Sequence, residues 1–320
     1  MRCNQRTVLW LAGMMAIGGT VSGSDPLAAL SDDFSSPLTL ANWQRVTIVE
    51  QWPNEPLESH DIGGTREGWM TLMPRTSSWY EDYRGALLFK EVTGDFIATT
   101  RVESRNRAGT GAPGRLYSLG GLMTRAPREI TPATWTAGEE RYTFLSIGAA
   151  NQEGTFQFEV KATSNYDELP QYSRLDVYNT ECECGDATIR TARLGIYIIQ
   201  LAQEADGPWR IIFRYRRPDL PPTVQVGMFA YTDWDNVSQY PVTEQNTTTI
   251  THVHNQPGVP TQPDLVAQFD YVHYATPNIP AEWAGLDLAD PSVISDGELL
   301  AILGGSLTPV DPMPEQGWVY

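Results

Sequence analysis

The segment Thr155–Ala162 reads TFQFEVKA and alternates strictly between apolar and polar side chains from position 156 onward. Positions 156, 158 and 160 are apolar, whereas positions 157, 159 and 161 are polar or charged. Successive side chains of an extended chain point to opposite faces, so one face packs on a core and the other meets water. The segment Trp209–Arg216 (WRIIFRYR) repeats the pattern, with apolar residues at 209, 211, 213 and 215. Both segments predict strands of a half-buried antiparallel sheet.

Further runs of this kind follow one another between turns rich in Gly, Pro, Asn and Asp. They favour β-branched and aromatic residues, as pleated positions do. Because almost no helical period separates them, an alternating strand–helix fold is excluded. We predict an all-β fold, a two-sheet antiparallel jelly-roll sandwich with a short C-terminal helical appendage. The additional strands are expected at Trp43–Gln51, Trp69–Arg75, Ala86–Val92, Phe96–Glu103, Leu116–Arg125, Tyr142–Ala149, Arg174–Asn179, Ile189–Ala202, Val224–Trp234 and Leu265–Ala275.

The N-terminus has the pattern of a signal peptide. Arg2 and Arg6 precede the apolar run Val8–Ile17, and small residues then lead to a cleavage site after Gly23. This run is too short to cross a hydrocarbon core of about 30 Å. We therefore expect residues 1–23 to be removed, no membrane span, and a secreted protein in an extracellular or periplasmic location.

The mature chain is expected to form one sandwich over residues 24–276, with inserted loops near 165–186 and 243–263. Residues 277–320 form a tail rich in Pro and Asp. Ser295 and Glu298 give this tail a capping-box pattern, which predicts one short helix that stops at Gly304. The tail is a candidate for docking or for self-association.

The formal net charge of −17 bears on the partners. So acidic a surface repels phosphate backbones, which argues against nucleic acids and anionic membrane surfaces as partners. Cys182 and Cys184 remain after processing, and a strained local disulfide and two free thiols are equally compatible with their spacing.

Several landmarks occur in a fixed order between residues 31 and 275. They are Asp33-Phe34, Trp43, Trp69–Met73, Gly85–Phe89, Gly94-Asp95-Phe96, Gly120–Met123, Gly207-Pro208-Trp209, Val224–Ala230 and Phe269–Val272. In this order they resemble the concanavalin A-like lectin/glucanase superfamily, and most of all its laminin-G-like, non-catalytic members. The resemblance implies two curved antiparallel sheets with a concave face, and loop sites for sugar or calcium.

The catalytic glucanases of that superfamily carry Glu-x-Asp-x-x-Glu on one strand, and this chain has no such motif. Glu159 stands alone on its strand, while Glu181 and Glu183 fall in the irregular cysteine segment. We predict a non-catalytic, secreted, carbohydrate-binding protein whose partner is a glycan or polysaccharide. A polysaccharide-degrading enzyme with an unrecognised active site and a cell-surface structural or assembly protein remain the alternatives.

Aromatic residues are the first candidates for ligand binding. Trp79, Tyr80 and Tyr83 crowd a polar segment between two early strands, and Trp234 lies between two aspartates at a strand end. Exposed aromatic faces stack on the apolar faces of sugar rings, while charged neighbours bond the hydroxyl groups. The alternative is that these rings cover one edge of the core.

Metal ligands are the second set of candidates. Asp233 and Asp235 share one loop, and Asp270 on the final strand could join them to bind calcium through carboxylate oxygens. His252 and His254 lie on one side of an extended chain, as two metal ligands would. A solvated acidic turn is the alternative for the aspartates, and we expect no cofactor other than calcium.

Overall fold

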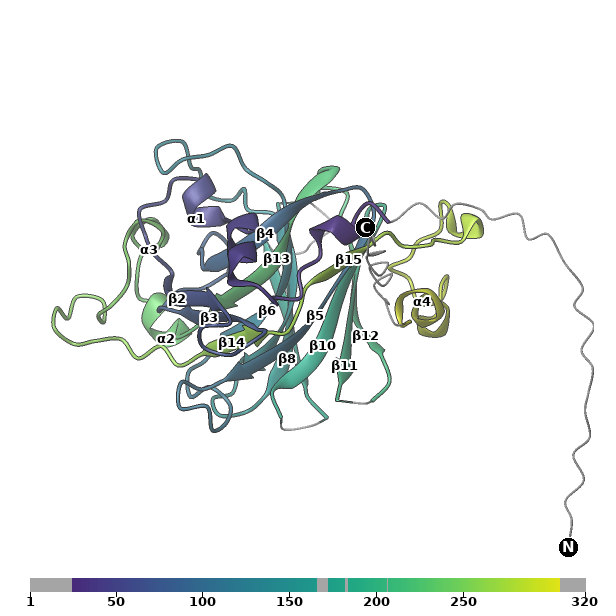
Figure 1. Ribbon diagram of the computed structural model, residues 1–320. Coiled ribbons are helices and arrows are strands. Elements are labelled where there is room, and N and C mark those ends of the chain that lie inside the picture. The colour runs from purple at the N-terminus through teal and green to yellow at the C-terminus, as the bar shows by residue number, and fades with distance from the viewer. Residues whose placement is uncertain (1–24, 166–171, 182–183, 206, 306–320) are drawn as a thin grey trace, which may run out of the picture.

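The computed structural model describes residues 25–165, 172–181, 184–205 and 207–305. Two antiparallel β-sheets stack face to face over these residues (Figure 1). The predicted all-β sandwich is confirmed. The expected signal peptide, Cys182 and residues 306–320 lie outside the described residues.

The first sheet has seven strands in the order β1-β4-β13-β6-β7-β8-β9. The latest of these strands in the sequence, β13, separates β4 from β6 and pairs with both. The strands are β1 (Gln44–Arg45), β4 (Ala86–Thr93), β6 (Ser118–Arg125), β7 (Tyr142–Ala149), β8 (Gln157–Thr163), β9 (Ser173–Asn179) and β13 (Thr223–Tyr231).

The second sheet runs in the order β12-β11-β10-β5-β14-β3-β2, and β15 also pairs with β5. Here too a late strand, β14, occupies an interior position between β5 and β3. The strands are β2 (Leu57–Ile62), β3 (Met70–Pro74), β5 (Phe96–Arg105), β10 (Asp186–Leu194), β11 (Tyr197–Glu204), β12 (Arg210–Arg216), β14 (Val266–Phe269) and β15 (His273–Ala275).

Short helices lie around the sheets. The capping box expected at Ser295 is present, because its hydroxyl accepts from the Glu298 N–H while the Glu298 carboxylate accepts from the Ser295 N–H at 2.9 Å. In the described part of the chain no helix has the length and apolar character needed to cross a membrane. The helices are η1 (Ala28–Leu30), η2 (Pro37–Asn42), α1 (Val46–Val49), α2 (Trp234–Val237), α3 (Val242–Thr247), η3 (Ala281–Trp283) and α4 (Asp296–Leu303).

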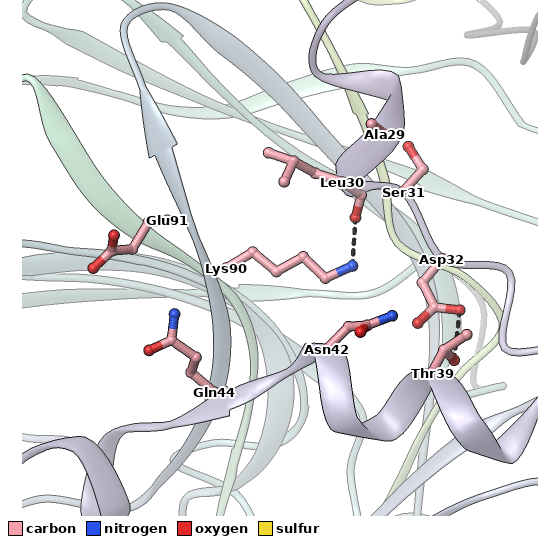
Figure 2. Close-up of a pocket in the computed structure, with 9 residues that line it drawn as sticks. All are labelled: Ala29, Leu30, Ser31, Asp32, Thr39, Asn42, Gln44, Lys90 and Glu91. Carbon is pink, nitrogen blue, oxygen red and sulfur yellow. Dashed lines mark hydrogen bonds between the residues drawn. The ribbon is translucent and has the colours of Figure 1, made fainter.

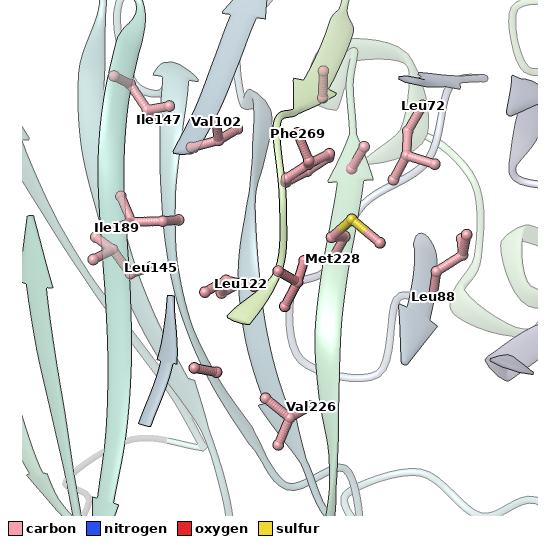
Figure 3. Close-up of a cluster of buried hydrophobic side chains, with 14 of the residues drawn as sticks. Leu72, Leu88, Val102, Leu122, Leu145, Ile147, Ile189, Val226, Met228 and Phe269 are labelled. Carbon is pink, nitrogen blue, oxygen red and sulfur yellow. The ribbon is translucent and has the colours of Figure 1, made fainter. Parts of the chain in front are cut away.

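The main core fills the space between the two sheets. Figure 3 shows Leu122, Leu145 and Met228 of the first sheet in the same cluster as Ile189 and Phe269 of the second. These side chains occupy alternate positions of their strands, as the period of two in the sequence predicts.

The outer face of the first sheet is buried as well. Phe144 and Phe229 point away from the main core, and with Trp79 they belong to a second apolar cluster. Residues 75–85, here called the covering segment, and helix α1 supply the side chains that close over this face. The sequence placed the polar side of Thr155–Ala162 in water, and this expectation is wrong because the covering segment lies over it.

The outer face of the second sheet is covered by the C-terminal part of the described chain. Trp283, Leu288 and Leu299 pack with Ile199 and Leu201 of β11 in a third apolar cluster. Figure 1 shows α4 beside β11 and β12, on the other side of the molecule from α2. Residues 277–305 are therefore packed on the sandwich and do not form a free linker.

Four predicted strands differ from the structure. The run Leu265–Ala275 is interrupted after Phe269 and gives the two strands β14 and β15. Val46–Val49 forms one helical turn inside the run Trp43–Gln51, because Val46 is packed into the second apolar cluster. The run Ile189–Ala202 turns at Gly195, whose φ of +61° is in the left-handed region, and so gives two strands. β13 ends at Tyr231, which leaves Trp234 to begin α2.

Candidate aromatic binding site

A pocket of about 190 Å³ opens on the outer face of the first sheet, between the covering segment and α2. Its walls are aromatic and its floor carries one charged group. It is lined by Ser78, Tyr80, Tyr117, Lys161, Leu175 and Trp234. Tyr80, Tyr117 and Trp234 are all half-buried, so part of each ring remains accessible to a ligand.

Trp234 is held in place by a buried turn. Asp233, which precedes it, has a φ of +72°, a left-handed conformation that short polar residues tolerate better than most. Its buried carboxylate accepts hydrogen bonds from the Thr76 hydroxyl at 2.7 Å and from the Asn236 amide at 2.8 and 2.9 Å. The backbone N–H of Trp234 donates to the Leu116 carbonyl at 3.1 Å. These bonds link the covering segment, α2 and the start of β6, and they fix where the indole lies.

The other rings meet Trp234 edge to face. The centroids of Tyr80, Tyr83 and Tyr117 lie 5.3, 5.7 and 6.3 Å from the Trp234 centroid. Tyr83 is anchored from behind, because its hydroxyl donates to the Tyr240 carbonyl at 2.9 Å. The structure thus brings together three of the aromatic residues that the sequence singled out, Tyr80, Tyr83 and Trp234.

Lys161, on the floor of the pocket, belongs to a buried ion pair on β8. The Lys161 ammonium lies 2.8 Å from a Glu159 carboxylate oxygen and donates to the Trp79 carbonyl at 3.0 Å. The Tyr231 hydroxyl donates to the other Glu159 oxygen at 3.2 Å. Lys161 also lies 5.1 Å from the ring centroid of Tyr80 and 5.7 Å from that of Tyr117, so the ammonium faces the aromatic walls.

Burial shifts the titration of these groups. It lowers the pKa of Lys161, although Glu159 opposes the shift by favouring the ammonium form. It also raises the pKa of Tyr80, Tyr117 and Tyr231. The tyrosines are neutral hydrogen-bonding groups around neutral pH.

Trp79 does not belong to the accessible walls. The sequence treats it as an exposed ring that could stack on a sugar, and this is wrong, because Trp79 is fully buried. Its Nε1–H donates to the Ala86 carbonyl at 3.1 Å, and its ring packs against Tyr142 with centroids 5.5 Å apart. Trp79 is the side chain with which the covering segment closes the sheet face.

Tyr117 and Lys161 are pocket residues that the sequence reasoning missed. Lys161 is one of only two lysines in the chain and lies on a clearly alternating strand. These two features could have marked it as a candidate site residue. No comparable local signal marks Tyr117, which has a φ of +50° just before β6 begins.

A buried ion network anchors the covering segment beside the pocket. The Arg84 guanidinium bonds both Glu50 and Glu140. Arg125 on β6 bonds the same two carboxylates, at 2.8 Å to Glu50 and 3.0 Å to Glu140, and Arg128 adds a bond of 2.9 Å to Glu140. Burial alone would raise the pKa of Glu140, but the guanidinium groups outweigh it and lower this pKa to about 2.

The predicted calcium ligands lie in different surroundings. The Asp233 carboxylate is already engaged by Thr76 and Asn236, whereas Asp235 is exposed. Asp270 lies 3.6 Å from the Arg101 guanidinium. Among the residues that the structure describes, no three His, Cys, Asp or Glu side chains gather as they would to hold a metal ion.

His252 and His254 both contact Tyr240. The Tyr240 hydroxyl donates to the His252 carbonyl at 2.6 Å, and the Tyr240 ring centroid lies 4.5 Å from that of His254. The His254 Nε2 atom is 3.4 Å from a Glu244 carboxylate oxygen. The two imidazoles thus take part in the packing of the 243–263 loop.

A second hollow, of about 440 Å³, lies at the edge of the first sheet beside η1 and η2. Figure 2 shows Lys90 crossing it to donate to the Leu30 carbonyl, at 2.7 Å, while Asp32 accepts from Thr39 at 3.1 Å. The Lys90 ammonium also lies 4.5 Å from the Trp43 ring. The protein's own lysine thus occupies the centre of this oxygen-lined hollow.

Cys184 is disulfide-bonded. Its sulfur partner lies outside the described residues.

Comparisons with known proteins find similar folds at low sequence identity. No protein-family model and no curated protein matches the chain. A solved protein of unknown function from Saccharomyces cerevisiae is 17% identical over 74% of this chain and 98% of its own, with a TM-score of 0.47. Xylan beta-1,4-xylosidase from Bacillus halodurans C-125 is 12% identical over 82% of this chain, which spans 41% of that enzyme, with a TM-score of 0.48.

The kappa-carrageenase from Pseudoalteromonas carrageenovora, solved with an oligotetrasaccharide of kappa-carrageenan, is 11% identical over 82% of this chain and 99% of its own, with a TM-score of 0.46. Similar structures include members of the concanavalin A-like lectin/glucanase fold, which the sequence landmarks resemble. At these identities and TM-scores they carry no inference about what this chain binds.

Proposed function

We propose that this protein is exported and binds a glycan at the aromatic pocket without cleaving it. The observation that carries the proposal is the meeting of three accessible rings, Tyr80, Tyr117 and Trp234, around the Lys161 ammonium. Aromatic faces stack on the apolar faces of sugar rings, and a fixed donor between them bonds a hydroxyl or ring oxygen. Such walls around a polar floor are the chemistry of a sugar-binding pocket.

The surroundings of the pocket favour binding over cleavage. Hydrolysis of a glycosidic bond normally uses two carboxyl groups that flank the bond at about 5–9.5 Å from each other. The residues that line the pocket include no carboxylate, and Glu159 beneath them is paired with Lys161. The covering segment also fills the sheet face on which a long polysaccharide would have to lie.

The size of the pocket sets the expected ligand. A volume of about 190 Å³ lies below the roughly 300–1,000 Å³ of pockets that hold drug-sized molecules. The pocket therefore suits one sugar unit, such as the end or a branch of a glycan.

The test is a glycan array and a pull-down on insoluble polysaccharides with residues 24–320, in which released sugar is assayed in the same wells. Trp234→Ala and Tyr117→Ala should each weaken retention at least tenfold, since loss of a stacking ring removes about 1.5 kcal/mol or more. Tyr197→Ala, a half-buried ring on β11 of the other sheet, is the matched control and should bind as the wild type does. Undiminished retention by the Trp234→Ala protein would refute the proposed site.

The same wells test calcium and catalysis. Each arm is run with calcium and with a chelator, since calcium binding by Asp233, Asp235 and Asp270 remains a proposal. An enzyme is the second candidate function, because Lys161, with its lowered pKa, lies beside Glu159 and Tyr231. Sugar release that disappears in Lys161→Met would establish the enzyme, whereas retention without release supports the binding protein.

Export has its own measurement. Expression of the full chain in a host that secretes proteins should deliver it to the medium or the periplasm. Its intact mass should correspond to a chain that begins at Ser24. A cytoplasmic product that retains Met1 would contradict the proposed location.

A further inference from the structure

A polar cavity of about 410 Å³ lies on the outer face of the second sheet, where α4 ends. Thr99 of β5, Thr188 of β10 and Gln203 of β11 line it, together with the rings of Tyr271 and His273. Its backbone wall is Gly304-Gly305. The aromatic pocket lies on the other sheet, so the two sites have no lining residue in common.

Arg190 is the only charged side chain among the residues that line this cavity, apart from the half-buried imidazole of His273. It is only 2% exposed. Its Nε–H donates to the Thr99 hydroxyl at 2.8 Å, and its Nη1 donates to the carbonyls of Leu303 and Gly305. The guanidinium carbon lies 4.3 Å from the centroid of the Trp209 ring. These contacts hold the guanidinium plane in one orientation.

The Nη2 group of Arg190 forms no hydrogen bond with any residue that the structure describes, and no described carboxylate lies within ion-pair distance of it. Three other deeply buried arginines are paired with acids. Arg84 and Arg125 bond Glu50 and Glu140, and Arg217 bonds Asp219 at 2.7 Å. A buried cation without a countercharge is costly, and burial accordingly lowers the pKa of Arg190 to about 10.

We propose that this cavity binds a carboxylate, carried by a small ring-shaped acid of the size of a uronic acid. The guanidinium edge that includes Nη2 offers N–H groups to a planar carboxylate, which is the geometry that arginine matches best. Thr188 adds a hydroxyl to the neighbouring wall, where it interacts with the Tyr271 side chain beside the proposed carboxylate. The bound anion neutralises the buried guanidinium, while the volume and the aromatic rings accommodate the rest of the acid.

Calorimetric titration with sodium glucuronate, sodium sulfate and glucose tests this proposal on residues 24–320. Glucuronate should bind saturably, and glucose, which has the ring without the carboxylate, should not. Arg190→Lys keeps the charge but loses the planar guanidinium, and we expect it to weaken glucuronate binding at least tenfold. The matched control is Arg193→Lys on the same strand, whose guanidinium is bonded to the carbonyls of Pro221, Pro222 and Leu220. This control should bind glucuronate as the wild type does.

Thr188→Val is the second variant, because it removes this hydroxyl without disturbing the Arg190 contacts to α4. It should weaken glucuronate binding severalfold while the melting temperature stays unchanged. No saturable glucuronate binding, equal binding by the Arg190→Lys protein, or sulfate bound as tightly as glucuronate would each overturn the proposal. Glucuronate binding that appears only when the chain is shortened to end at Gly305 would show that residues 306–320 fill the cavity, which would also overturn it. Trp234→Ala should leave glucuronate binding intact, so this result is independent of the aromatic pocket.

Discussion

Glu140 is a buried carboxylate that accepts bonds from the guanidinium groups of Arg84, Arg125 and Arg128. These groups lower its pKa from about 4.5 to about 2. Because the folded protein holds the carboxylate in its charged form, the stabilisation is complete above pH 4.5. It is lost as the pH falls from there towards 2.

Glu140→Gln should therefore destabilise the protein most at neutral pH, by roughly 3–5 kcal/mol, because it removes one partner of a buried ion network. Urea unfolding at a series of pH values measures the difference between wild type and variant. We expect this difference to shrink between pH 4.5 and pH 2. Glu91→Gln, which changes an exposed glutamate on β4, is the control and should change the free energy of unfolding by less than about 0.5 kcal/mol. A difference that stays constant down to pH 2 would contradict the role of the charge.

The residues of the aromatic pocket were predictable only in part. Tyr80, Tyr83 and Trp234 stand out because large rings in polar segments need a reason to be there, and the structure brings these three together. The same reasoning fails for Trp79, since no local feature distinguishes a ring that binds a ligand from one that closes a core. The sequence analysis missed Lys161 for a related reason. A strand's alternation shows which side chains share a face, but it does not show that a segment some eighty residues earlier covers that face.

At the scale of elements, the predictions hold where local chemistry decides. The capping box at Ser295 and Glu298 predicted α4, and β7 has the predicted bounds, Tyr142–Ala149. They fail where packing decides. Val46–Val49 is made entirely of β-branched residues and yet forms a helical turn, because Val46 must reach the second apolar cluster.

Helix α4 is expected to contribute to the stability of the whole sandwich. Leu299 and Leu303 are fully buried against the second sheet in the third apolar cluster. Leu299→Ala should cost about 2–5 kcal/mol through lost burial and the cavity that it leaves. Ala301→Ser, on the exposed side of the same helix, is the control and should cost less than about 1 kcal/mol.

Thermal and urea unfolding measure both variants. A single transition that shifts for Leu299→Ala alone would show that α4 unfolds with the sandwich. An unchanged midpoint for Leu299→Ala would instead mark residues 277–305 as an independent appendage.

At the scale of the whole molecule, each sheet depends on a strand that comes late in the sequence. β14 lies between β5 and β3, and β13 lies between β4 and β6. A chain shortened to end at Asp264 lacks β14 and β15, so it leaves the edges of β3 and β5 unpaired. We expect this chain to lose its cooperative thermal transition and to aggregate, since unpaired strand edges are templates for association.

A chain that ends at Gly305 is the control for this truncation, because it keeps both late strands and α4 and should unfold cooperatively. Circular dichroism and light scattering during heating distinguish the two chains. A cooperative transition in the chain that ends at Asp264 would show that the fold does not depend on β14 and β15.

The late positions of β13 and β14 in the sequence also determine when the two sheets can form during synthesis. A growing chain leaves the ribosome from its N-terminus, and neither sheet can close until its interior strand has emerged. Hydrogen bonds that join Asp32 to Val272 and Asp25 to Thr276 connect the start of the described chain to residues after β14, so they form only when most of the chain has been made. Until its interior strand has emerged, neither sheet has its full set of strands. The topology thus postpones the finished structure until nearly the whole chain is available, and it makes the closing of both sheets a late step of synthesis.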